Sequence, residues 1–115
     1  MFSDLILKSL DEPGMFEVVG DVWWMPDDKF FPHDLQLTVP AGYVTDLASI
    51  PPGLRSLFNR TGKSRKPAVF HDYMYSIKYK TRKECDQTFM KMLKERGMSG
   101  WKARIYYIGV RSGGW

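Results

Sequence analysis

The sequence has few of the features that stabilise or target secreted proteins. Cys85 is the single cysteine among 115 residues, so no disulfide can form within the chain and packing alone must stabilise the fold. The N-terminus, Met-Phe-Ser-Asp, has neither a basic segment nor an apolar run as long as an export signal needs. No stretch approaches the length of a membrane span. We therefore expect no signal peptide and no transmembrane segment.

Acidic residues are scarce after residue 52. Residues 1–52 contain nine acidic and two basic residues, a net charge of −7, whereas residues 53–115 contain four acidic and fifteen basic residues, a net charge of +11. Opposite charges attract, so the acidic part can dock onto the basic part within one chain or between copies. Self-association therefore explains the basic composition as well as a nucleic-acid partner does, and nucleic acid is the less favoured partner.

The chain length and the residue pattern predict one α+β domain over residues 1–115. A chain of 115 residues is too short for two domains with separate cores. Residues 1–49 are rich in strand patterns, such as the alternation in Leu35-Gln36-Leu37-Thr38-Val39, and Asp-Glu-Pro-Gly and Met-Pro-Asp-Asp supply turns. The expected strands are Leu5–Lys8, Met15–Met25, Leu35–Val39 and Gly42–Thr45.

Helical patterns replace the strand patterns over residues 50–115. Pro51 and Pro52 suit the first turn of a short helix that ends by Phe58. Thr81 followed by Glu84 is a capping box that opens a later helix. We expect a small N-terminal antiparallel sheet packed against a helical half that contains a helix hairpin.

The last two helices have a predicted boundary and predicted buried faces. Gly97 is a plausible C-cap, and Ser99 opens the last helix. The second helix of the hairpin places Cys85, Thr88, Phe89, Met92 and Leu93 on one apolar stripe. In the last helix, Trp101, Ile105 and Ile108 are expected to face the core.

The helix hairpin carries the candidate catalytic residues His71, Asp86 and Tyr75. His71 lies about two helical turns before the hairpin turn and Asp86 about one and a half turns after it, so an antiparallel hairpin sets them opposite each other. Tyr75, four residues after His71, shares its helix face. We predict a hydrogen bond between His71 and Asp86, direct or through one water, with Tyr75 lining the same space. Such a pair is the material of a general base with an orienting carboxylate, or of a metal site.

Two further carboxylates, Asp46 and Asp72, are candidate metal ligands. Asp46 follows an expected strand at its junction with the next helix, where a carboxylate can be functional or can form an Asx turn with nearby backbone amides. Together with backbone carbonyls from residues 42–49, Asp46 and Asp72 could hold calcium or magnesium. A closed structural zinc site is excluded, because the chain has one cysteine and two histidines.

Four motifs make the chain resemble an uncharacterised domain family that is widespread in tailed bacteriophages and prophages. They are Val-Pro-Ala-Gly-Tyr-Val-Thr-Asp-Leu-Ala-Ser-Ile-Pro, Ala-Val-Phe-His-Asp-Tyr-Met-Tyr, Arg-Lys-Glu-Cys-Asp-Gln-Thr-Phe and Trp-Lys-Ala-Arg-Ile-Tyr-Tyr. The resemblance runs from residue 35 to Trp115. It implies a phage protein located in the virion or in the host cytoplasm, and it assigns no activity.

A shorter resemblance implies a mechanism. His71-Asp72-x-x-Tyr75 followed by Cys85-Asp86 is similar to the active-site helices of secreted and prokaryotic phospholipases A2. The resemblance implies that His71 is the base, Asp72 the calcium ligand, Asp86 the orienter of His71 and Tyr75 a partner of Asp86. The glycine-rich calcium loop and the disulfides of those enzymes are absent, so residues 42–49 would have to supply substitute oxygens.

Structural explanations compete with these functional ones. His71 can be a buried residue that ties two helices together through Asp86. Asp72 can be an exposed residue that the helix dipole favours in an early turn. Cys85 is expected to be a buried structural thiol and His33 a turn residue. The other expectations are aromatic core or interface positions at Trp23, Trp24 and Trp115, and a solvated or phosphate-contacting basic loop at Arg55–Lys66.

Two functions follow from these residues together with the phage origin that the family resemblance implies. The first is hydrolysis of lipid or peptidoglycan in the host envelope, by an enzyme-like pocket of Asp46, His71, Asp72 and Asp86 with or without a divalent cation. The second is a non-catalytic virion component of the tail or head-tail region. Its partners would be other phage structural proteins or further copies of the chain.

Overall fold

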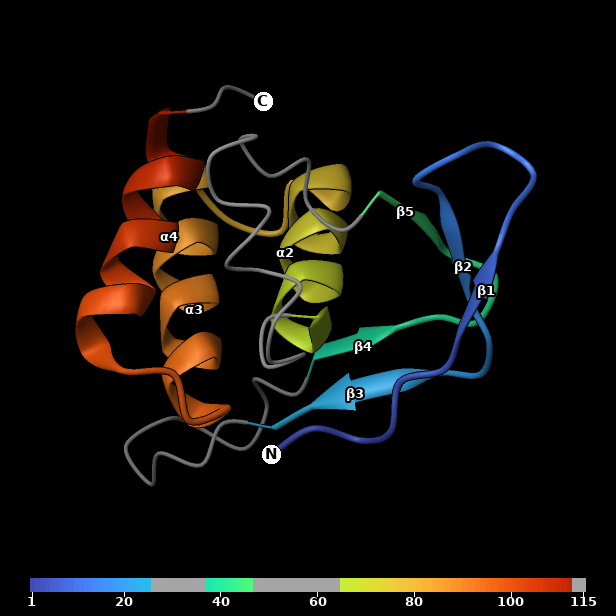
Figure 1. The fold of residues 1–115 in the computed structure, drawn as a ribbon, viewed down its shortest axis with the longest axis horizontal. Helices are drawn as coiled ribbons and strands as arrows, with labels where there is room; N and C mark the ends of the chain where they lie inside the picture. The colour runs from blue at the N-terminus through green and yellow to red at the C-terminus, as the bar shows by residue number, and fades with distance from the viewer. Residues whose placement is uncertain (26–36, 47–64, 113–115) are drawn as a thin grey trace. The chain divides into compact units, whose positions relative to one another are not determined.

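The computed structural model describes residues 1–25, 37–46 and 65–112. The chain divides into two compact units, Met1–Asp46 and Leu47–Trp115. All described strands belong to the first unit and all described helices to the second, so the expected α+β class is confirmed (Figure 1). The expected helix from Pro51 to Phe58 lies outside the described residues.

The first unit contains a three-stranded antiparallel sheet in the order β1-β2-β5, with β1 at Leu7–Ser9, β2 at Phe16–Val18 and β5 at Val44–Thr45. The turn between β1 and β2 is the expected Asp-Glu-Pro-Gly turn, where Gly14 has a φ of 80°. Glycine adopts this left-handed conformation without the steric cost that a side chain adds. The predicted Asp-Glu-Pro-Gly turn is therefore confirmed.

A second sheet pairs β3 (Val22–Trp24) with β4 (Leu37–Val39) in antiparallel register. The predicted single strand Met15–Met25 is wrong, because Gly20, with a φ of 78°, lies between β2 and β3, and these two strands belong to different sheets. The alternation predicted in the Leu35–Val39 strand is confirmed over its described part. The inward side chains of β3 and β4 are all buried: Val22, Trp24, Leu37 and Val39.

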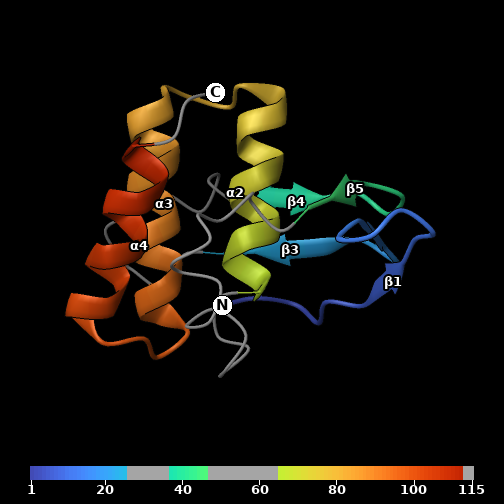
Figure 2. The same cartoon turned by 45° about the horizontal axis from the view of Figure 1, so that its top comes forward.

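The second unit contains three described helices, α2 (Arg65–Ile77), α3 (Arg82–Glu95) and α4 (Gly100–Ser112). Helix α3 packs against both α2 and α4 (Figure 2). Because α2 begins at Arg65, the last two residues of the expected basic loop are helical, and that expectation was wrong for them. None of the three described helices is long and apolar enough to cross a membrane.

Helix α3 begins and ends where the sequence predicts. The Glu84 amide donates to Thr81 Oγ1 at 3.1 Å, and the Thr81 hydroxyl donates to Glu84 Oε1 at 2.9 Å. At the other end Gly97 has a φ of 92°, its amide donates to the Lys94 carbonyl, and the Met98 amide donates to the Leu93 carbonyl. These two bonds form a Schellman motif, which terminates the helix and reverses the chain into α4.

An apolar cluster holds α2, α3 and α4 together. Its buried members are Ala68, Phe89, Leu93, Ala103, Tyr106 and Val110. The members from α4 recur at i, i+3 and i+7 and form one helix face.

The expected buried face of α4 was wrong. Trp101, Ile105 and Ile108 are 64%, 37% and 57% exposed. Helix α4 has two apolar stripes on opposite sides, and the buried one contains Ala103, whose small side chain allows α4 to approach α3 closely. Periodicity identifies both stripes but does not tell which one packs.

Candidate functional site

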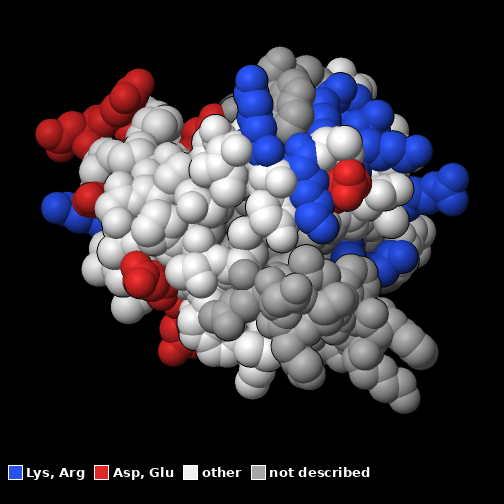
Figure 3. Space-filling model, turned by 180° about the vertical axis from the view of Figure 1, so that it is seen from behind, with Lys and Arg blue, Asp and Glu red and all other residues white. Residues whose placement is uncertain are grey.

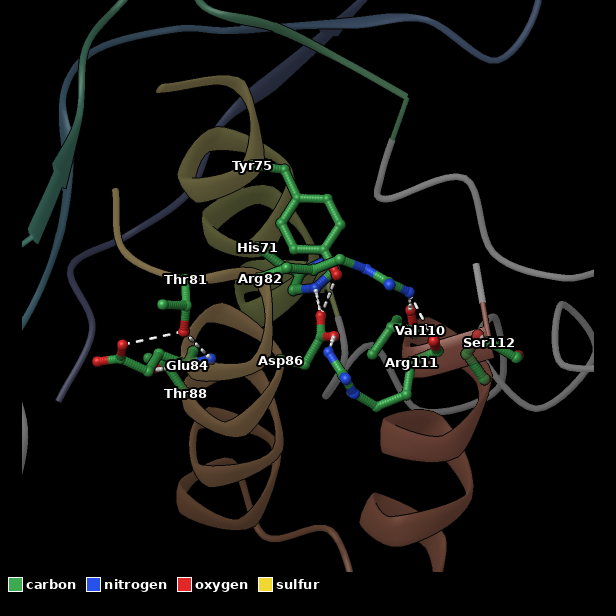
Figure 4. A network of polar contacts seen from close by, with 11 residues as sticks. His71, Tyr75, Thr81, Arg82, Glu84, Asp86, Thr88, Val110, Arg111 and Ser112 are labelled. Atoms are coloured by element: carbon green, nitrogen blue, oxygen red, sulfur yellow. Dashed lines mark hydrogen bonds and ion pairs between the residues drawn. The ribbon is translucent and has the colours of Figure 1, made fainter. Parts of the chain in front are cut away.

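The predicted contact between His71 and Asp86 is confirmed. His71 Nε2 lies 2.7 Å from Asp86 Oδ1, and the two residues are 2% and 0% exposed. The Tyr75 hydroxyl donates to the same oxygen, and Arg111 donates to Asp86 Oδ2 at 3.2 Å. We call these four residues, His71, Tyr75, Asp86 and Arg111, the Asp86 cluster; Figure 4 shows Asp86 at its centre.

Local structure accounts for the approach of α2 to α3. Helix α2 ends at Ile77, and Lys78 adopts a left-handed φ of 51° that reverses the chain. The Thr81 cap then starts α3. This short connection makes the helices an antiparallel pair, with His71 and Tyr75 facing Asp86.

Asp86 is held as a carboxylate. Burial raises its pKa, but the hydrogen bonds from His71 and Tyr75, the charge of His71 and the hydrogen bond from Arg111 together outweigh burial and leave the pKa below the ordinary value. A carboxylate is an acceptor only. Both oxygens of Asp86 thus accept hydrogen bonds from the surrounding side chains.

Tyr75 stays protonated beside this charge. Burial raises the pKa of Tyr75, and the hydrogen bond to Asp86 and the negative charge of Asp86 raise it further. The Tyr75 ring also packs on His71, with ring centroids 4.2 Å apart, and Phe89 packs on His71 at 4.6 Å. Tyr75 therefore acts as a hydrogen-bond donor and as one of two aromatic neighbours that fix the imidazole ring.

The Asp86 carboxylate fixes the state of the imidazole. Because Asp86 can only accept, Nε2 of His71 must carry the hydrogen. In neutral His71 the lone pair then lies on Nδ1, which is buried and has no hydrogen-bond partner among the described residues. This is the arrangement of a general base whose second nitrogen is oriented by a carboxylate.

Two arginines in this region were missed by the sequence reasoning. Arg111, on α4, donates to Asp86 Oδ2. Arg82, on α3, donates to the carbonyls of Val110 and Arg111 at 3.2 and 2.5 Å. The available signal was a basic residue in the last turn of α4, where cations favour the helix dipole. That signal does not identify a partner on another helix.

The other two site candidates, Asp46 and Asp72, are not members of the Asp86 cluster. Asp72 lies in the middle of α2 and is half-buried, so the explanation that it is an exposed residue of an early helical turn was wrong. Asp46 is the exposed last residue of the first unit. Within the described ranges, no group of three or more His, Cys, Asp or Glu side chains is placed to hold a metal ion.

Cys85 is buried, as expected, and is not activated. It is 1% exposed, and burial raises the pKa of its thiol. A raised pKa keeps the sulfur protonated and therefore weakly nucleophilic. Cys85 is therefore a structural thiol. Trp24 is a core aromatic, as expected, whereas His33 and Trp115 lie outside the described residues.

Comparisons with known proteins give a family and one distant relative. A family model described as "Protein of unknown function (DUF1353)" matches residues 27–110. The uncharacterised protein y4jT of Sinorhizobium fredii is 32% identical over 106 residues, and the match covers 90% of this chain but only 30% of that relative. No solved structure matches the chain.

Proposed function

The chain belongs to the DUF1353 family, whose function is unknown, and we propose that it is a bacteriophage hydrolase that uses His71 as a general base on the host envelope. The substrate class is a lipid or peptidoglycan bond. The phage origin is supported by the motif resemblance described above, and the reaction by the Asp86 cluster.

The observation that carries the hydrolase proposal is the state of His71 Nδ1. A buried polar atom without a partner costs about 1–3 kcal/mol, so a histidine that served only to tie helices together would be expected to bond through both nitrogens. His71 bonds through Nε2 and leaves Nδ1 without a partner among the described residues. Arg82 Nε and Arg96 Nε are also buried without a partner among the described residues, but of these three nitrogens only His71 Nδ1 can carry a lone pair that accepts a proton.

The reaction follows from this tautomer. His71 Nδ1 takes a proton from a water molecule, and the water oxygen attacks the carbonyl carbon or the other electrophilic centre of the bond to be cleaved. The imidazolium that forms is stabilised by the Asp86 carboxylate at 2.7 Å. The proton on Nδ1 then passes to the leaving group as the bond breaks. Asp86 acts as a positioning residue, because it acts through His71.

Tyr75 and Arg111 support Asp86 in this role. Tyr75 donates to the oxygen that His71 also uses, and Arg111 holds the other oxygen. Together they restrict rotation of the carboxylate and so restrict the imidazole. Because Nδ1 is buried, water and substrate reach it only when neighbouring side chains rearrange.

Calcium or magnesium is a separate part of this proposal. Asp72 and Asp46 have the hard oxygen atoms that these ions prefer. The base reaction at His71 uses no metal. Calorimetric titration with each ion, repeated on Asp72→Asn, tests whether the protein binds a cation through Asp72. If neither ion binds at millimolar concentration, the cation is excluded from the proposal and base catalysis by His71 is retained.

The second candidate is a non-catalytic virion component of the tail or head-tail region. The observation in its favour is that Asp86 on α3 bonds to side chains from both α2 and α4. In that case the Asp86 cluster ties the helical unit together and the protein acts through partners, either other phage proteins or further copies of itself.

The experiment compares His71→Ala with Ser76→Ala, an exposed position on the same helix outside the Asp86 cluster. Both proteins are melted, assayed on phospholipid vesicles and on peptidoglycan, and carried by phage in infectivity tests. General-base catalysis predicts that His71→Ala loses about 10²- to 10⁴-fold in activity at temperatures where it is still folded. Its melting temperature should fall in either case, because the buried Asp86 loses a hydrogen-bond donor. Ser76→Ala should behave as the unmodified protein.

No hydrolytic activity in the unmodified protein, together with His71→Ala particles that lack a tail or head component, would instead support the non-catalytic virion component. Acylation by diethyl pyrocarbonate gives a check that needs no substrate. Modification of the His71 peptide under native conditions, measured by mass spectrometry, is required for the hydrolase. A His71 that resists the reagent until the protein unfolds contradicts it.

A further inference from the structure

Helix α4 has an apolar stripe on the side opposite the core. Trp101, Ile105 and Ile108 recur at i, i+4 and i+7 and are 64%, 37% and 57% exposed. At 100° per residue this stripe is centred opposite the buried stripe of the same helix. Lys102 and Arg104 flank it on its two sides. We call Trp101, Lys102, Arg104, Ile105 and Ile108 the outer face of α4.

The three-stranded sheet of the first unit also has an exposed apolar patch. Glu17 is paired with Val44 across β2 and β5, and the Val19 amide donates to the Ile6 carbonyl one step beyond the paired residues of β1 and β2. Alternation places these side chains on one face of the sheet. Ile6, Val19 and Val44 are 60%, 46% and 43% exposed. Lys8 is paired with Glu17 across β1 and β2, so it lies on the same face, and it is exposed. We call Ile6, Lys8, Glu17, Val19 and Val44 the outer face of the sheet.

The two outer faces belong to units of opposite charge. The first unit, Met1–Asp46, has nine acidic and two basic residues, a net charge of −7, and the second has fifteen basic and four acidic residues, a net charge of +11. Figure 3 shows Lys and Arg side chains gathered on one part of the surface and acidic side chains on another. Exposed apolar groups rimmed by charge mark interaction surfaces.

We propose that the outer face of α4 docks onto the outer face of the sheet in a second copy of the chain. The three apolar residues of α4 cover the three of the sheet. Because Lys8 lies opposite Glu17 on the sheet face, the electrostatic attraction comes from the opposite net charges of the two units, −7 and +11, and not from Glu17 alone. An anionic lipid surface also suits Trp101, Lys102 and Arg104, but it leaves the sheet patch exposed and repels the acidic unit. A second copy covers both patches and brings units of opposite net charge together.

The contact joins two different surfaces, so every copy offers one of each. Such a contact closes as a two-fold pair with two reciprocal contacts, closes as a ring, or continues as an open chain. Association must weaken as salt rises, because exposed charges more than a Debye length of about 10 Å apart are screened at 0.1 M.

Sedimentation velocity over a range of concentrations tests the contact with three variants. Ile108→Glu disrupts the α4 face, Val19→Glu disrupts the sheet face, and Ile77→Glu is the matched control, since Ile77 is 48% exposed and belongs to neither face. Each interface variant should weaken association by about tenfold or more, as substitution of a central contact does. The control should associate as the unmodified protein. Circular dichroism checks that each variant is folded.

A mixture of the two interface variants tests whether the outer face of α4 binds a second copy of the chain or another partner, such as a lipid surface. Ile108→Glu retains the sheet face and Val19→Glu retains the α4 face, so an equimolar mixture has one intact contact and should form a dimer and nothing larger. A monomeric unmodified protein, or a mixture that stays monomeric, overturns the proposal. So does a monomer that sediments with phosphatidylglycerol vesicles and loses this binding in Ile108→Glu, which assigns the outer face of α4 to lipid.

Discussion

Helices α2, α3 and α4 are held together by two clusters of opposite chemistry. The apolar cluster joins them through side chains such as Leu93, Ala103 and Tyr106, all at most 3% exposed. The Asp86 cluster joins the same helices through hydrogen bonds to one buried carboxylate. Both clusters are built from groups removed from water, so the difference between them lies in what burial costs.

Burial favours the apolar cluster and disfavours the Asp86 cluster. Apolar surface gains about 25 cal/mol per Å² when it leaves water, in any orientation that packs well. A buried carboxylate loses its hydration, and only correctly placed hydrogen-bond donors and positive charges compensate for that loss. The apolar cluster thus stabilises the helices wherever its side chains pack well. The Asp86 cluster stabilises them only when each hydrogen-bond donor is correctly placed around the carboxylate. Three predictions test this contrast.

The largest expected effect is on the apolar side. Leu93→Ala removes a fully buried side chain from the apolar cluster and leaves a cavity between α3 and its neighbours. We expect the free energy of unfolding to fall by about 2–5 kcal/mol, measured by urea denaturation. His71 should keep its reactivity toward diethyl pyrocarbonate in the folded variant. A loss below about 1 kcal/mol would mean that the helices can close the cavity at little cost.

A smaller effect is expected at the Asp86 cluster. Asp86→Asn keeps the shape but replaces one acceptor oxygen by an amide group, so either Arg111 or the pair His71 and Tyr75 faces a donor. We expect a loss of about 1–3 kcal/mol in the same urea experiment. Gln87→Ala, at an exposed neighbouring position on α3, is the control and should change stability by no more than about 0.5 kcal/mol. Equal stability of Asp86→Asn and the control would show that the cluster contributes nothing.

The smallest effect is the acid dependence of stability. The pKa of Asp86 is lower in the folded protein than its ordinary 3.8, so below that pH the unfolded chain binds protons that the folded chain does not. Stability from Asp86 is therefore fully present above pH 3.8 and is lost as the pH falls through the folded value. Urea midpoints measured between neutral pH and pH 3 should fall less steeply in Asp86→Asn than in Leu93→Ala. Parallel curves would remove Asp86 as the cause.

The sequence by itself determined the features that depend on neighbours along the chain. The Thr81–Glu84 cap, the helix end at Gly97 and the turn before Gly14 each need only a few consecutive residues, and all three are present. The facing of His71, Tyr75 and Asp86 also follows from local rules, because a short hairpin turn fixes the phase of both helices. Hence the core of the candidate site could be predicted.

The tertiary structure decided everything that depends on which surfaces meet. Arg111 and Asp86 are 25 residues apart and come together only because α4 packs on α3. The same packing buries Ala103 and leaves Trp101 exposed, although both stripes of α4 are apolar. The division of Met15–Met25 between two sheets is likewise a matter of strand pairing. Periodicity gives the direction of a side chain relative to its own helix or strand, but the partner is selected by shape and charge across the whole fold.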